Sequence, residues 1–258
     1  MKKLAIASAL FSALAVAGTA NAYQAEVGVS AGLTDPDHGS TTGTYGVNGT
    51  AYFKPVQVRN SPLAEAAYLD RASNVKAQYN YSKVDDVKLH NYSAGVEYFV
   101  PDSDFYVGGE IGRKDLKFKN ASNLNTTVYT AEVGYLPAPG LLVAVGAKGF
   151  RNDDVHRTSP SLRAKYVTAL SNGQDINLEA GATFGKTREY NVAADYYFDK
   201  TLSVGADFHK NNYLENREYG IKVDKFFTQN ISLEGRVGFG KLDHNDYTSY
   251  GLAAKYRF

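Results

Sequence analysis

The sequence predicts an all-β fold, a transmembrane antiparallel β-barrel of about 14 strands, and three observations predict it. Apolar and polar residues alternate with period two through most of the chain after residue 22. No stretch of that region approaches the ~18 uninterrupted apolar residues that indicate a membrane-spanning helix. Turn-like and polar segments divide the chain into an even number of strands, as bacterial single-chain barrels require.

The composition agrees with this fold class. The chain has 20 Tyr, 13 Phe and 24 Gly, no Trp, and a mean hydropathy of −0.36, which is too polar for a helical membrane protein. A barrel needs only alternate residues of each strand to be apolar. The absence of Cys excludes disulfides, thiol catalysis and cysteine-ligated metals. A soluble all-β domain of this length remains an alternative at this point.

The N-terminus has the three parts of a secretory signal peptide. Lys2 and Lys3 precede a short apolar run, and a small-x-small ending closes at Ala22. The run is too short for a transmembrane anchor, which needs about 20 apolar residues. We therefore expect a signal peptide over 1–22 and a barrel over 23–258. Loss of the two lysines lowers the formal charge from +1 to −1, so the charge gives no argument for a nucleic-acid partner.

The strands follow one another with short interruptions. In the first, Val27, Val29 and Leu33 fall on the same face as Tyr23, and Glu26 falls on the other. The fourth and sixth strands are centred on residues 92–98 and 129–135. The other expected strands are 23–33, 42–53, 75–83, 105–112, 141–150, 161–169, 176–185, 190–198, 201–209, 218–226, 231–240 and 250–258.

The connections indicate the orientation of the barrel. Those after even-numbered strands are mostly short, whereas those after odd-numbered strands are mostly longer and polar, such as the Lys- and Asn-rich segment 113–125. Short turns at one rim and long loops at the other are typical of a barrel with both termini in the periplasm. Aromatic residues gather at strand ends, as an interfacial girdle would place them. They are Tyr98, Phe99, Phe105, Tyr135, Tyr197, Phe198, Phe226, Phe227 and Phe258.

The last strand, 250–258, predicts how the barrel closes. Its apolar face would be an aggregation-prone edge without a partner, and the natural partner is the first strand. A terminal Phe258 with aromatics spaced two apart resembles the signature by which bacterial outer-membrane proteins are recognised for assembly. The resemblance implies the barrel-assembly machinery as a partner.

Several segments carry a more specific resemblance. The stretch 62–75, which follows Ala51-Tyr-Phe-Lys54, and the strand segments 142–146, 202–206 and 255–258 resemble the small general bacterial porin family of Gram-negative outer membranes. The resemblance implies an outer-membrane channel for small hydrophilic solutes that is surrounded by outer-membrane lipid. The family has no catalytic motif or cofactor to transfer. The loops after odd strands match least, which leaves the solute open.

The alternation also predicts which charged residues line the lumen. Fourteen strands lie between the eight that side chains can fill and the sixteen to eighteen that leave an aqueous channel, so we expect a narrow pore. Nine acids, Glu26 among them, and eight bases face inward, which predicts weak ion selectivity because no ring of one sign forms. Alternatively, these charges pair across neighbouring strands and only solvate the wall. The candidate pore-lining residues are Lys76, Glu97, Glu110, Glu132, Lys148, Arg163, Lys165, Glu179, Asp195, Asp207, Lys222, Asp224, Glu234, Arg236, Lys255 and Arg257.

Segment 54–74 is too long for a periplasmic turn of such a barrel. Ser61-Pro62 predicts a helix start, with Ser as the cap and Pro at the first helical position. We expect a short helix that packs across the periplasmic mouth as a partial plug, with Glu65, Asp70 and Arg71 as candidate gate residues. A surface turn outside the lumen is the alternative.

Other functions have less support in the sequence. A barrel hydrolase needs a His with a nucleophile or carboxylate partner. Asp243 precedes His244 directly, but an acid next to a His is common in polar loops. The five His residues show no metal-ligand spacing, so we expect no catalytic site and no metal site. A non-conducting barrel with a structural or adhesive role remains the alternative to a channel.

Overall fold

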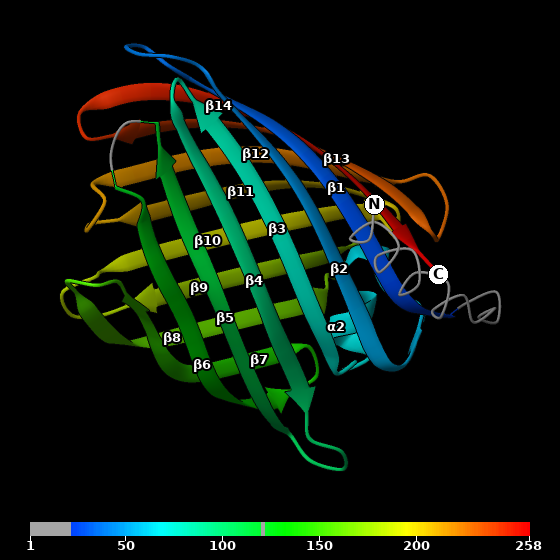
Figure 1. The fold of residues 1–258 in the computed structure, drawn as a ribbon. Coiled ribbons are helices and arrows are strands. Elements are labelled where there is room, and N and C mark those ends of the chain that lie inside the picture. Colours follow the sequence, from blue (N-terminus) through cyan, green and yellow to red (C-terminus); the bar gives the residue numbers. More distant parts are fainter. Residues whose placement is uncertain (1–21, 120–121) are drawn as a thin grey trace, which may run out of the picture.

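The computed structural model describes residues 22–119 and 122–258, and almost all of that chain is strand (Figure 1). The predicted signal peptide lies outside the described residues apart from Ala22, and it stays a prediction. The strands are β1 Ala22–Pro36, β2 Thr42–Gln57, β3 Asn74–Val84, β4 Val87–Phe99, β5 Phe105–Phe118, β6 Leu124–Ala138, β7 Leu141–Arg151, β8 His156–Ala169, β9 Asp175–Thr183, β10 Glu189–Asp199, β11 Leu202–Asn211, β12 Asn216–Phe226, β13 Ile231–Leu242 and β14 Asn245–Arg257.

The strands form one closed antiparallel barrel. Each strand pairs with its neighbours in sequence, and β1 pairs with β14 over a register that runs from Glu26 opposite Arg257 to Pro36 opposite Tyr247. This closure removes the free edges that an open sheet would expose. The predicted fold class, the 14 strands and the pairing of the first strand with the last are confirmed.

The outer wall is apolar and the inner wall is polar. Large hydrophobic side chains such as Val29, Ile111, Val133 and Ile221 are about 60% exposed on the outside, where a bilayer would cover them. Because successive strand residues point to opposite faces, the charged residues between them face the lumen. The wall therefore has the chemistry of a membrane-spanning barrel.

Segment 113–125 differs from its prediction as a loop. Strand β5 runs to Phe118 and β6 begins at Leu124, so most of this Lys- and Asn-rich segment is paired strand. Its polar side chains reflect contact with water beyond the bilayer, and antiparallel pairing of the backbone continues there without an apolar face.

Apart from the link between β2 and β3, the connections at both rims are two to five residues long, so the expected contrast between short turns and long loops is wrong.

A bulge turns the start of β1 inward. The amides of Gln24 and Ala25 both donate to the carbonyl oxygen of Phe258, at 2.8 and 2.9 Å, and the register with β2 shifts between Tyr23 and Ala25. Tyr23 consequently packs edge-to-face on Tyr52 and is only 3% exposed. The expectation that Tyr23 shares the outward face of Val27 is wrong, because an extra residue in a bulge reverses the alternation.

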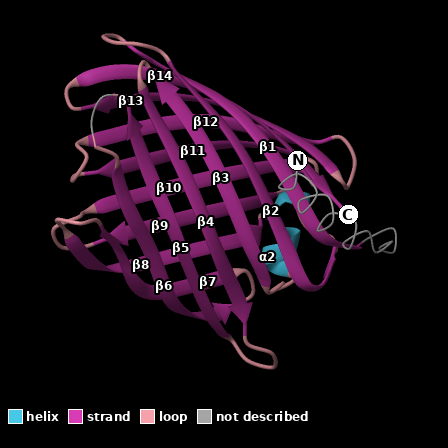
Figure 2. Ribbon diagram, viewed as in Figure 1, coloured by secondary structure: helices cyan, strands magenta, loops and turns pink. Residues whose placement is uncertain are grey.

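The helical pieces η1 (Leu63–Glu65) and α2 (Ala66–Leu69) lie inside the ring of strands (Figure 2). They occupy the end of the barrel where β1 begins and β14 ends, which we call the terminal rim; the other end is the opposite rim. In residues 22–119 and 122–258, no helix is long and apolar enough to span a membrane.

Candidate functional site

The link between β2 and β3, residues 58–73, folds into the terminal rim, and we call it the inner segment. Pro62 occupies the N-cap of η1 with φ −53° and ψ 133°, and no side chain caps the helix. The prediction of Ser61 as cap and Pro62 as the first helical residue is therefore displaced by one position. Helix α2 ends when the amide of Asp70 donates to the carbonyl of Ala66 and Arg71 adopts a positive φ of 49°.

Glu65 attaches the inner segment to the far side of the barrel. Its Oε1 accepts a 2.8 Å hydrogen bond from the hydroxyl of Tyr197 on β10. Its Oε2 lies 2.8 Å from Nζ of Lys165 on β8, which also binds Glu179 on β9 at 2.8 Å. Glu65 is only 6% exposed, so these partners compensate a carboxylate that water reaches poorly. The segment thus spans from β2 and β3 to strands on the facing wall.

Further hydrogen bonds hold the backbone of the segment. The amide of Leu63 donates to the carbonyl of Lys200 at 2.8 Å, and the carbonyl of Leu63 accepts from Nη1 of Arg257 at 2.9 Å. The hydroxyl of Tyr68 donates to the carbonyls of Gly140 at 3.0 Å and Lys165 at 3.2 Å. Burial raises the pKa of Tyr68 to about 12, so this hydroxyl remains a neutral donor.

Apolar contacts cover both flanks of the segment. On one flank Ala66 and Ala72 pack in a cluster with Tyr23, Tyr52 and Val56 of β1 and β2. On the other flank Tyr68 packs against a second buried cluster that consists of Phe99, Tyr106, Leu136 and Leu142. The segment is therefore packed into the barrel rather than laid on its surface.

Asp70 and Arg71 lie at the edge of the segment. Asp70 accepts from the amide of Gln57 at 3.0 Å and from Nη2 of Arg59 at 3.1 Å, so its contacts stay local. Nη1 of Arg71 binds Oδ1 of Asp104 at 2.9 Å, in the turn between β4 and β5. Of the three candidate gate residues, only Glu65 reaches the facing wall.

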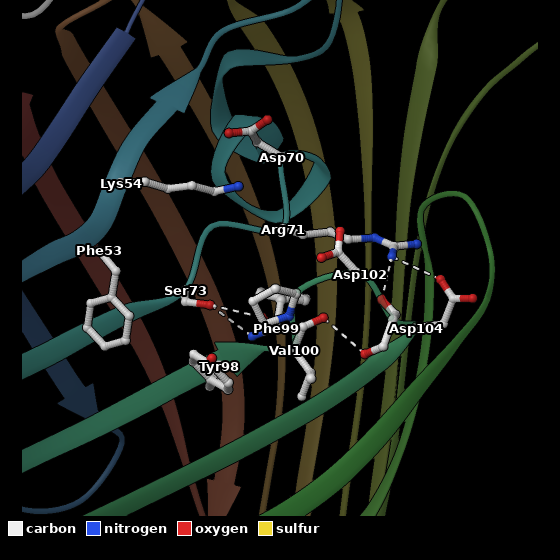
Figure 3. A pocket seen from close by; sticks show the side chains of 12 residues that line it. Phe53, Lys54, Asp70, Arg71, Ser73, Tyr98, Phe99, Val100, Asp102 and Asp104 are labelled. Atoms are coloured by element: carbon white, nitrogen blue, oxygen red, sulfur yellow. Dashed lines mark hydrogen bonds and ion pairs between the residues drawn. The ribbon is translucent and has the colours of Figure 1, made fainter.

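A cavity of about 690 Å³ opens beside this edge (Figure 3). Lys54, Asp70 and Arg71 line one side of it, and the turn between β4 and β5 lines the other. In Figure 3, Arg71 extends toward Asp104, and both residues line this cavity. The inner segment is thus tightly packed at Glu65 and bordered by a hollow at Arg71.

Most of the predicted lumen charges pair with one another. Arg163 binds Glu132, Lys222 binds Asp195 at 2.9 Å, and Arg236 binds Asp207 at 2.6 Å. Thirteen of the sixteen candidates form such pairs, with each other or with a further acid: Lys76, Glu97, Glu110, Glu132, Lys148, Arg163, Lys165, Glu179, Asp195, Asp207, Lys222, Arg236 and Arg257.

Three candidates stand apart from these pairs. Asp224 and Glu234 lie directly opposite each other on β12 and β13, and Lys255 lies on β14 opposite Ser232. Within the described ranges, none of the three has an oppositely charged group within 4.0 Å. They form a separate charged area of the inner wall.

Three acids complete the pairs. Glu26 binds Arg257 at 3.1 Å, as its inward position allows. Glu189 binds Lys148 at 2.9 Å, and Glu218 binds Arg236, but the pore-lining prediction includes neither. Glu218 lies four residues before Lys222 on the same strand, so alternation predicts that its side chain also faces inward. Glu189 falls outside the expected strand 190–198, and the true start of β10 is needed to place it.

A group of metal-ligand residue types lies elsewhere. Glu215, Asp243 and His244 offer ligand atoms within 4.8 Å of one another in two turns at the opposite rim. All three are exposed, and exposed acidic groups commonly lie close together without a metal. This group gives no argument for a resident metal.

Comparison with known proteins identifies the family. The family described as "Putative general bacterial porin" matches residues 1–156 and 143–258, two overlapping stretches that together span the whole chain. The chain belongs to this porin family. No curated protein matches the porin.

Solved structures agree with this assignment. The porin is similar to the crystal structure of the Acinetobacter baumannii outer membrane protein Omp33, with a TM-score of 0.73 and 30% identity over 93% of this chain and 100% of that chain. A TodX deltaS2S3 mutant monoaromatic hydrocarbon channel shares the fold, with a TM-score of 0.52 and 9% identity over 93% of this chain and 91% of that one. The porin is a β-barrel of the bacterial outer membrane.

Proposed function

We propose that this porin is a passive diffusion channel for small hydrophilic solutes. The observation that carries the proposal is the exposure of charged side chains on the inner wall. Lys76 and Glu97 form an ion pair, yet their side chains are 40% and 32% exposed, and Lys148 in its pair with Glu189 is 41% exposed. Charged groups keep this much exposure only where water reaches them. A wet, polar lumen is what a hydrophilic solute needs.

The same pairs support weak ion selectivity. Selective pores use rings of charges of one sign. Here acids and bases lie close together around the wall, as in the ion pairs Lys76–Glu97, Arg163–Glu132 and Lys165–Glu179. Each pair cancels most of its own field at a distance, so neither cations nor anions gain a large advantage.

We also propose that the inner segment narrows the periplasmic mouth and acts as its gate. Barrels of this class place both termini in the periplasm, so the terminal rim faces that side. The contacts of Glu65 with Lys165 and Tyr197 stabilise the closed position of the inner segment. The cavity beside Arg71 leaves room for the segment to shift. Glu65 is the gate residue in this proposal, with Asp70 and Arg71 at its edge.

The surroundings of the barrel follow from its outer wall. Exposed apolar residues contact outer-membrane lipid. The strand that ends at Phe258 is the segment through which we propose recognition by the barrel-assembly machinery.

The porin family and its channel neighbours favour a channel over a barrel enzyme, so we propose no catalytic residues and no cofactor.

Swelling of proteoliposomes in iso-osmotic solutes tests the channel directly. The refolded chain 23–258 should admit glycerol and pentoses, and uptake should fall steeply for disaccharides, because the lumen of a 14-stranded barrel is narrow. Liposomes with heat-denatured protein provide the control. If folded protein admits not even glycerol, the channel proposal fails and a structural or adhesive barrel replaces it.

A further inference from the structure

The outer wall of β3 and β4 is layered at the opposite rim, and β5 lies beside them in Figure 1. On β5 the residues level with Tyr92 and His90 are Arg113 and Asp115, which form an ion pair at 2.6 Å. The register of the three strands places outward residues in level rows. Val75 lies opposite Val96, and toward the opposite rim Tyr79 lies opposite Tyr92. Next comes Tyr81 opposite His90, and the outermost row is Lys83, Lys88 and Lys117. On β3 and β4 the outward residues thus change from aliphatic to aromatic to cationic over a few residues.

The aromatic layer marks the boundary of the bilayer. The rings of Tyr79 and Tyr92 lie 5.0 Å apart, and those of Tyr81 and His90 lie 5.1 Å apart. The hydroxyl of Tyr79 is 2.9 Å from Nδ1 of His90. Aromatic belts of this kind sit at head-group level. The cationic row lies two residues farther along the strands, about 7 Å away.

Lys83, Lys88 and Lys117 form a row of like charges, which we call the lysine row. Lys88 is directly opposite both other lysines, and all three are exposed. Like charges directly opposite each other destabilise a sheet. Across residues 22–119 and 122–258, no carboxylate lies within 4.0 Å of any of the three, whereas nearby Lys119 pairs with Asp86 at 3.7 Å. The row therefore has no ion-pair partner of its own, and the nearest outward acid on β5, Asp115, is already paired with Arg113 at 2.6 Å.

The lysine row can be compared with two other places where outward cations lie. On β11, β12 and β13 a similar row of Lys210, Arg217 and Lys241 is partly neutralised, because Lys241 pairs with Asp246 at 3.2 Å. Near the terminal rim, the outward Lys225 lies singly between Leu202 and Leu233. Lys210 and Arg217 form no ion pair within the described residues either, so the two rows differ in the pair that Lys241 makes.

We infer that the lysine row binds the phosphorylated head group of a lipid in the outer leaflet of the membrane. A phosphate group supplies the negative charge and the oxygen acceptors that three neighbouring ammonium groups require. The position just beyond the aromatic belt is the height of lipid head groups, and the aliphatic rows below it would contact the acyl chains. This inference uses the periplasmic orientation of the termini but not the channel activity.

Lipid binding to the folded porin in detergent tests the inference, with bound lipid counted by native mass spectrometry. The probes are bis-phosphorylated lipid A and its dephosphorylated form. We expect wild-type porin to retain the phosphorylated form preferentially. Lys88→Gln should weaken retention about fivefold, and the triple change K83Q/K88Q/K117Q about a hundredfold, from the usual contribution of a lysine near anionic lipid.

The matched control is Lys225→Gln, which removes one outward lysine at the other end of the barrel and should bind lipid A as the wild type does. The charge-preserving triple K83R/K88R/K117R should also bind, which separates charge from folding. Equal lipid A retention by wild type and the glutamine triple, or equal retention of the dephosphorylated form, would overturn the inference. So would row-dependent binding of soluble polyphosphate as tight as that of lipid A.

Discussion

At the scale of single residues, Glu65 is the contact on which the position of the inner segment depends most. It binds Lys165 and Tyr197, whereas Lys165 has a second acid in Glu179. If the segment were released, Lys165 would remain paired with Glu179, whereas the Glu65 carboxylate would have only water as a partner. The contacts of Glu65 with Lys165 and Tyr197 can therefore be lost without disrupting the strands of the wall.

Glu65→Gln tests this tie. The change removes the charge of one partner but keeps its size, and we expect it to weaken attachment by about 1–3 kcal/mol. The open fraction of the channel in planar-bilayer recordings should rise. Glu189→Gln is the control, because it removes the 2.9 Å pair with Lys148 and leaves the inner segment untouched. An open fraction that rises equally in both variants would contradict the role of Glu65.

At the scale of elements, the inner segment is the exception among short connections. Its removal can be designed from the structure, since the amide of Phe53 already donates to the carbonyl of Ser73 at 2.9 Å. An Asn-Gly turn in place of residues 54–72 would join this pair as a two-residue hairpin. The barrel should then close without its plug.

This deletion should give a larger single-channel conductance than the wild type, by about twofold or more, because the narrowest part of the path is gone. The control replaces residues 184–188 at the opposite rim with Asn-Gly, which joins Thr183 to its partner Glu189. Heat-modifiable migration on gels verifies that both variants fold. Unchanged conductance in the folded deletion variant would exclude the segment as the constriction.

The elements also show how far the sequence could predict the fold. Alternation located all fourteen strands, because one face of each meets lipid and the other meets water. It underestimated the length of β5 and β6, because residues beyond the bilayer are polar on both faces while their backbones stay paired. It could not foresee the bulge beside Tyr23, since an inserted residue leaves no mark on composition.

At the scale of the whole molecule, the lumen is organised by pairs of charges. The inward direction of Lys165 and Glu179 follows from alternation, but the meeting of both with Glu65 follows only once the barrel has closed. Contacts across a lumen join strands distant in sequence, so alternation cannot assign partners. The plug expected over 54–74 was likewise inferred from its length, and its attachment points on β8 and β10 were not predictable.

Single-channel recording of refolded chain 23–258 in a planar bilayer tests whether the porin is a weakly selective diffusion channel. We expect discrete current steps. Across a tenfold KCl gradient, the reversal potential should be much nearer zero than the roughly 59 mV of an ideally selective pore, because the wall charges are paired. A folded barrel that gives no steps, or a reversal potential close to that limit, would contradict a weakly selective diffusion channel.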